Sequence, residues 1–114
     1  MVKTSGEFSL AAGAVLVSAV LHVVVIVVSG GGYVVPMLAG AVGWFVIGAG
    51  LQRGLRWLAH LAFLLAMIGG VVAMAYAMGA FGLTALAFWG IVAADCAAAV
   101  LLFVALWRGP QLVE

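Results

Sequence analysis

The sequence predicts an all-α integral membrane protein, in which four transmembrane helices form an up-down-up-down bundle with both termini in the cytoplasm. Of the 114 residues, 69% are hydrophobic and only 6% are charged. So few charges cannot cover the surface of a water-soluble domain, whereas a bilayer requires only that charges collect at its two faces. The apolar segments lack period-2 alternation, which favours helices over a β-barrel. We expect one transmembrane domain covering residues 1–114.

The chain divides into four apolar segments, each close to the roughly 20 helical residues that cross a bilayer. They cover approximately residues 8–29, 33–51, 57–79 and 83–107. Glycines or charged residues separate them, and all the connections are short. Short connections make successive helices antiparallel neighbours. Pro36 falls in the first turn of the second segment, where its missing N–H costs little.

All the basic residues fall on one side of the membrane if each segment crosses it once. Lys3 precedes the first span, Arg53 and Arg56 lie between the second and third, and Arg108 follows the fourth. The positive-inside rule makes that side the cytoplasm, and we expect a bacterial inner (plasma) membrane. The residues expected to anchor the helices at this interface are Trp57, Trp107, Arg53, Arg56 and Arg108.

Small residues recur at helical spacing in every span. In lipid, helices associate through close approach at small residues and through a few polar contacts. Ala59, Ala62 and Ala66, for example, lie on one stripe of the third span. The residues expected at helix–helix contacts are Ser18, Gly43, Gly69, Gly70, Gly90 and Ala94.

Asp95 is the one carboxylate inside a predicted span, and it lies near the bilayer centre. An isolated carboxylate there costs roughly 2.5–3.5 kcal/mol on insertion scales, so we expect it to be protonated, paired or beside an aqueous cavity. Helical rise places His22 roughly 10 Å and Asp95 roughly 18 Å from the outer face. His22 and Trp44 are the favoured partners, and Ser18 and Tyr76 rank lower by depth. Both a functional role and a structural interhelical hydrogen bond remain open.

The sequence predicts no cofactor, no metal and no catalytic residue. His22 and His60 differ in height by more than about 10 Å, so one haem cannot join them within a chain. Asp95, Cys96 and His22 lack the ligand spacing of a zinc site. A single cysteine excludes an internal disulfide. A net charge of +1 without a basic run gives no footprint for nucleic acid.

In length and number of spans the chain is similar to the small multidrug resistance transporters. That family works through a carboxylate in its first membrane helix, where this chain has His22 and no acid. The resemblance therefore covers the outline alone, and no functional residue is carried over.

The favoured function is a non-catalytic small subunit or accessory protein of a larger respiratory, photosynthetic or transport complex. Its partners would be membrane lipids and other integral membrane subunits. The alternative is a small homo-oligomeric proton-coupled transporter with Asp95 as its protonatable site and with His22 and Tyr76 lining a path to it. A membrane enzyme or quinone-binding protein ranks last, because one aspartate and two histidines at separate depths form no nucleophile–base pair.

Overall fold

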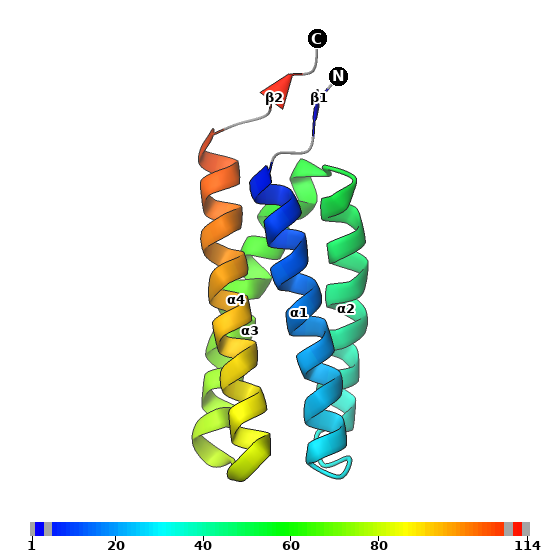
Figure 1. Cartoon of the computed structure of the whole chain (residues 1–114), viewed down its shortest axis with the longest axis vertical. Helices are drawn as coiled ribbons and strands as arrows, with labels where there is room; N and C mark the ends of the chain where they lie inside the picture. The colour runs from blue at the N-terminus through cyan, green and yellow to red at the C-terminus, as the bar shows by residue number, and fades with distance from the viewer. Residues whose placement is uncertain (1, 4–5, 109–110, 113–114) are drawn as a thin grey trace.

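Four helices make up nearly all of the protein. The computed structural model describes residues 2–3, 6–108 and 111–112, and side chains are described for residues 9–107. The helices are α1 Gly6–Val28, α2 Val34–Gln52, α3 Arg56–Gly79 and α4 Gly82–Arg108. They alternate in direction, so α1 and α3 run one way and α2 and α4 the other (Figure 1).

All four helices are long and apolar enough to cross a membrane, which confirms the predicted helical class. The candidate spans are Ser9–Val28, Val34–Gln52, Arg56–Gly79 and Gly82–Trp107. Their ends lie within one residue of the predicted segments. Pro36 is the third residue of α2, in the first turn as expected. Length and hydropathy therefore identified the helices correctly.

Short glycine-containing turns connect the first three helices. Gly30 and Gly31, with φ of 68° and 88°, adopt the left-handed conformation that side chains disfavour. The Gly31 N–H donates to the Ile26 carbonyl at 2.9 Å, which satisfies one of the carbonyls left free at the end of α1. Gly54, with φ of 74°, plays the corresponding role between α2 and α3. The α1–α2 turn returns the chain directly beside α1, whereas α3 makes only sparse contact with α2 after the second turn.

A two-strand pairing, not predicted from the sequence, joins the regions before α1 and after α4. β1 Val2–Lys3 and β2 Gln111–Leu112 pair antiparallel, with Val2 opposite Leu112. Both strands lie at the end of the bundle where α1 begins and α4 ends (Figure 1). Strands this short carry no periodicity, so their pairing depends on the helices bringing the two segments together.

The bundle is not equally packed on all sides. α1 packs along both α2 and α4, and α3 packs along α4, but α2 and α3 make only sparse contact with each other. On α3 the predicted small-residue stripe is buried, and its members are Ala59, Ala62, Ala66, Gly70, Ala73 and Ala77. This stripe lets α3 lie close to its neighbours on one face while the opposite side stays open. The result is a four-helix bundle with a gap between α2 and α3.

The basic residues come together at one end of the bundle. The strand containing Lys3, the α2–α3 turn with Arg53 and the end of α4 all lie there (Figure 1). Trp57 and Trp107 at this end are 66% and 81% exposed, as interface anchors would be. The side chain of Arg108, another predicted anchor, lies outside the described part of the chain.

Arg56, one of the predicted anchors, makes a hydrogen bond between two helices. Its Nη2 donates to the Leu106 carbonyl at 2.8 Å. This bond ties the first residue of α3 to the last turn of α4, where helical carbonyls lack intrahelical partners. The predicted anchor therefore also fastens two helices to each other.

Candidate functional site

A buried hydrogen bond joins α1 to α4 near the middle of both helices. The Ser18 hydroxyl donates to Asp95 Oδ1 at 2.6 Å. Ser18 is fully buried and Asp95 is 1% exposed. Both residues are buried where α1 and α4 pack along each other. The carboxyl group is therefore part of the helix interface and does not face the outside of the bundle.

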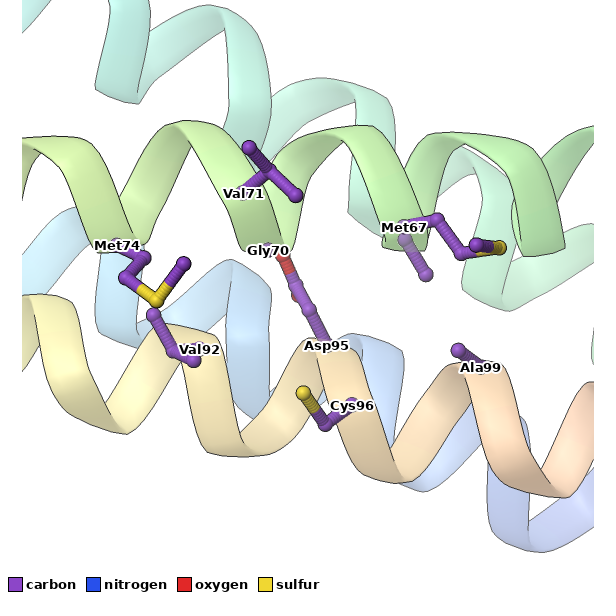
Figure 2. A pocket seen from close by; sticks show the side chains of 9 residues that line it. Met67, Gly70, Val71, Met74, Val92, Asp95, Cys96 and Ala99 are labelled. Carbon is purple, nitrogen blue, oxygen red and sulfur yellow. The ribbon is translucent and has the colours of Figure 1, made fainter.

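The second carboxyl oxygen of Asp95 is enclosed without a hydrogen bond. Oδ2 is buried and has no hydrogen-bond partner among the described residues. It faces α3 at a pair of glycines: a Cβ added at Gly69 would lie 3.0 Å from Oδ2, and one at Gly70 would lie 3.6 Å from the Asp95 Cβ. Figure 2 shows the Asp95 side chain pointing from α4 toward α3 at Gly70. Two glycines thus make the room that the carboxyl group occupies.

His22, one helical turn after Ser18, is bound to the same serine through the backbone. Its Nδ1 lies 2.6 Å from the Ser18 carbonyl oxygen, and the residue is 8% exposed. A carbonyl oxygen only accepts, so Nδ1 carries the hydrogen. In the neutral ring Nε2 then carries the lone pair and is an acceptor. Ser18 therefore connects His22 and Asp95, one through its carbonyl and the other through its hydroxyl.

The far edge of the His22 ring rests on α2 at a glycine. A Cβ at Gly40 would lie 2.5 Å from His22 Cδ2 and 2.6 Å from Nε2. No larger residue fits there without moving the ring. Gly40 therefore admits the imidazole edge between α1 and α2.

Two clefts flank α3 at this level. The first, the α3–α4 cleft, has a volume of about 260 Å³, and Figure 2 shows Met67 and Met74 on either side of Asp95. Its lining residues are Ala66, Met67, Gly70, Val71, Met74, Val92, Asp95, Cys96 and Ala99. The second, the α2–α3 cleft, has a volume of about 290 Å³ and is lined by His22, Ala39, Gly40, Gly43, Trp44, Ile47, Leu65, Ile68 and Gly69. The polar cluster thus borders one cleft with Asp95 and the other with His22.

The partner of Asp95 differs from the one favoured by helical rise. Asp95 bonds to Ser18, and no bond to His22 or Trp44 is found among the described residues. Counted from the same end of the bundle, Ser18 lies about 16 Å deep, almost level with Asp95 at roughly 18 Å. Depth therefore supported Ser18, and ranking it below His22 was wrong. Helices packed through small residues bring even the short serine hydroxyl within hydrogen-bond reach of a neighbouring helix.

The other two residues of the predicted polar site lie apart from Asp95. Trp44, which is 6% exposed, lines the α2–α3 cleft beside His22. Tyr76 stacks on Phe88 with ring centroids 5.3 Å apart, and it meets Tyr33 edge-on at 5.5 Å. This aromatic cluster lies toward the end of the bundle opposite the termini. Tyr76 therefore belongs to a packing cluster, whereas Trp44 shares a cleft with His22.

Most of the predicted packing residues lie at close contacts. Gly69 and Gly70 face Asp95, and a Cβ at Gly90 would come within 3.2 Å of Leu21 on α1. Ala94, next to Asp95, is 9% exposed. Gly43 differs, because a Cβ there would meet no described atom within 4 Å. It lines the α2–α3 cleft instead of a helix contact.

Gly40 was not among the predicted packing residues, yet a Cβ there would approach a polar side chain more closely than one at Gly69, at 2.5 Å against 3.0 Å. Its signal in the sequence was its place among several glycines in one short helix. That signal could not distinguish it from Gly43 or Gly48.

The remaining reactive side chains do not join the cluster. His60 is exposed, and its Nδ1 lies 3.1 Å from the Arg56 carbonyl oxygen. Cys96 is exposed beside Asp95, on the edge of the α3–α4 cleft. Within the described residues, no three His, Cys, Asp or Glu side chains come close enough together to hold a metal ion.

Chemically, the cluster combines one proton-binding carboxyl, a hydroxyl that bridges two helices and an imidazole nitrogen free to accept. Comparison of the chain with family models, curated proteins and solved structures finds no match. The function is therefore inferred from the geometry of this cluster.

Proposed function

We propose that this protein is a non-catalytic small integral-membrane subunit or accessory protein of a larger membrane complex. The observation that carries the proposal is the use of its intramembrane carboxyl group. Asp95 is 1% exposed and bonded to Ser18 across the α1–α4 interface, so it serves helix packing and does not meet a water-soluble substrate. A polar side chain that forms a hydrogen bond between helices is typical of a structural membrane helix bundle.

The outer surface supports the same proposal. Large apolar side chains are exposed along every helix; examples are Val27, Val35, Ile68 and Leu86, which are 73%, 77%, 60% and 67% exposed. Surface of this kind suits lipid or the apolar helices of other subunits. The partners that we propose are therefore membrane lipids and other integral membrane chains of a respiratory, photosynthetic or transport complex.

The proposed location is a bacterial inner membrane with both termini in the cytoplasm. The supporting observation is that the elements carrying Lys3, Arg53, Arg56 and Arg108 lie at one end of the bundle. Single cysteines test this orientation after the native Cys96 is replaced by alanine. Gln52→Cys, at the basic end, should resist a membrane-impermeant maleimide in intact cells. Gly32→Cys, in the exposed turn at the opposite end, should react, because a Cβ there meets only the Ser29 carbonyl oxygen at an ordinary 3.6 Å. The reverse pattern contradicts the orientation.

The main test is extraction from native membranes in a mild detergent, followed by size separation and mass spectrometry. We expect unlike membrane proteins to travel with this chain in constant ratio, and an Asp95→Asn variant to keep them, because asparagine preserves size and accepts the Ser18 bond. Purification of the chain alone as a homo-oligomer would contradict the proposal.

A second candidate is a small homo-oligomeric proton-coupled transporter with Asp95 as the protonatable site. The observation that favours it is Asp95 Oδ2, which is buried without a hydrogen-bond partner in the described chain and borders the α3–α4 cleft. In proteoliposomes containing a pH-sensitive dye, such a carrier moves protons in response to an imposed gradient. Asp95→Asn should abolish this movement and leave the oligomer intact, whereas equal proton movement by both forms excludes the role.

A further inference from the structure

The α2–α3 cleft is a slot between two helices that are held by other neighbours. α2 packs on α1, and α3 packs on α4, so the contacts between α2 and α3 are sparse. Glycines at positions 40, 43 and 69 line the slot without side chains. Its walls are therefore close to helix backbone at these points, and the space between them, about 290 Å³, remains free.

One hydrogen-bond acceptor is directed to this slot. His22 is 8% exposed and lines the cleft, and its Nδ1–H is committed to the Ser18 carbonyl at 2.6 Å. Its Nε2, the acceptor of the neutral ring, has no hydrogen-bond partner among the described residues. An acceptor that faces the apolar walls of a cleft open to lipid lacks the hydrogen bond that water would supply. A ligand that completes this site must therefore donate a hydrogen bond.

The rest of the slot is apolar and opens sideways. Ile47 and Trp44 are buried walls, whereas Leu65 and Ile68 at the mouth are 38% and 60% exposed. No charged side chain lines the cleft. In a protein that crosses the membrane, such a mouth opens to lipid. The ligand therefore travels in the lipid phase and carries no charge to be neutralised.

The size and shape of the slot favour a ring. A cavity of about 150 Å³ holds benzene, so about 290 Å³ accommodates a substituted six-membered ring. At Gly43 an added Cβ would meet nothing within 4 Å, which leaves a flat stretch of wall for a ring, and Trp44 offers an aromatic surface. A flat lipophilic ring that donates a hydrogen bond is a phenol or a quinol.

We propose that the α2–α3 cleft binds the ring of a membrane-soluble phenol or quinol, with the ring hydroxyl donating to His22 Nε2. The inference concerns binding alone and involves no electron transfer. It goes beyond the proposed function and does not rest on it, since a subunit of a complex and a free-standing protein could both hold this ligand. Co-purification and ligand binding are also separate measurements, so failure of one proposal leaves the other unaffected.

The test uses the fluorescence of Trp44 as a reporter of position. Trp57, Trp89 and Trp107 are 66%, 44% and 81% exposed and are replaced by phenylalanine, which leaves Trp44 as the one tryptophan. The probe is a brominated alkylphenol, whose bromine quenches a tryptophan that it touches. Its O-methyl ether is the matched probe, because it keeps the ring, bromine and chain but has no donor.

The phenol should quench Trp44 with a dissociation constant roughly three- to tenfold lower than that of the ether, as expected for one hydrogen bond. His22→Phe should remove this difference by weakening the phenol alone. His60→Phe is the control, since His60 makes the same Nδ1 contact to a carbonyl four residues earlier but is exposed. Ile68→Phe narrows the mouth of the cleft without adding a second tryptophan, and it should weaken the binding of both probes.

The two sources of a ring hydroxyl are distinguished by competition. A decyl-benzoquinol that displaces the bromophenol, where the corresponding quinone does not, identifies a quinol. Displacement by alkylphenols alone identifies a simple phenol. Displacement by a short-chain diacylglycerol with equal affinity would overturn the assignment to a ring.

Equal quenching by phenol and ether, or a preference for phenol that survives in His22→Phe, would also overturn the proposal. Because His22→Phe alters a packed residue, its helical circular dichroism is compared with that of His60→Phe. If His22→Phe does not fold, two measurements on proteins that keep His22 decide the result. They are the ratio of the phenol and ether dissociation constants and the effect of Ile68→Phe on both. A dimer that Ile68→Phe disrupts, with no Trp44 quenching by either probe, would assign the cleft to a second copy of the chain.

Discussion

The two sides of α3 near Gly69 differ sharply. On one side, Asp95 of α4 reaches α3 so closely that a Cβ at Gly69 would lie 3.0 Å from Oδ2, and Ser18 of α1 completes the junction. On the other side lies the α2–α3 cleft, although Gly43 of α2 is as small as Gly69. Small residues therefore permit helices to approach but do not make them do so. The tight side has a polar side chain to enclose, whereas the open side has none that joins α2 to α3.

The largest effect that distinguishes the two sides is expected from Gly69→Val. The added side chain begins 3.0 Å from Asp95 Oδ2, so α3 must move away from α4 or the carboxyl must leave its place. Overpacking of this kind costs about 2 kcal/mol in the free energy of unfolding. Gly13→Val is the control, because a Cβ at Gly13 meets nothing within 4 Å. Reversible unfolding in mixed SDS micelles measures the free energy of unfolding of both variants. Equal values for Gly69→Val and Gly13→Val would contradict a tight junction between α3 and α4.

Ser18→Ala should have the next largest effect. It removes the hydroxyl that donates to Asp95 Oδ1 and leaves neither carboxyl oxygen with a hydrogen-bond partner among the described residues. The expected loss of unfolding free energy is about 1 kcal/mol, within the range for buried and intramembrane hydrogen bonds. Ser29→Ala removes a longer bond, 3.4 Å to the Ile26 carbonyl at the end of α1, and should cost little. A loss in Ser29→Ala as large as that in Ser18→Ala would contradict the importance of the α1–α4 bond.

Two alanine substitutions on α2 compare a closely packed glycine with an open one on the side of the α2–α3 cleft. Gly40→Ala places a Cβ 2.5 Å from His22 Cδ2 and should destabilise the fold by about 1 kcal/mol. Gly43→Ala meets open space, and it should stabilise the helix by about 0.5 kcal/mol because alanine loses less backbone entropy than glycine. The same unfolding assay compares them. A change of stability in the same direction in both variants would contradict the claim that Gly40 is closely packed and Gly43 is not.

The smallest effect is expected at the end of the α3–α4 pair. Arg56→Gln removes the 2.8 Å bond to the Leu106 carbonyl at a partly buried position and should cost about 0.5 kcal/mol. Arg53→Gln, in the neighbouring turn, is the charge-matched control. Thermal unfolding in detergent measures the pair, and a larger loss in Arg53→Gln would contradict the role given to Arg56.

The sequence was sufficient for the helices because their signals are local. Apolar length, separating glycines and the position of Pro36 placed the ends within one residue, and the alanine stripe of α3 correctly predicted its buried face. For the site, Asp95 and His22 were recognised by the cost of placing polar groups in an apolar span. The short strands were not predicted, since their pairing depends on distant parts of the chain.

By itself, then, the sequence determined which segments are helical, which face of α3 is buried and which polar residues require an explanation. Only the tertiary structure decided that Asp95 bonds to Ser18, that Gly40 holds the His22 ring and that α2 stands apart from α3. Spacing along a chain gives the height and angular position of a residue on its own helix. The rotation and tilt of one helix against another follow from all their contacts together, and these determine which side chains meet.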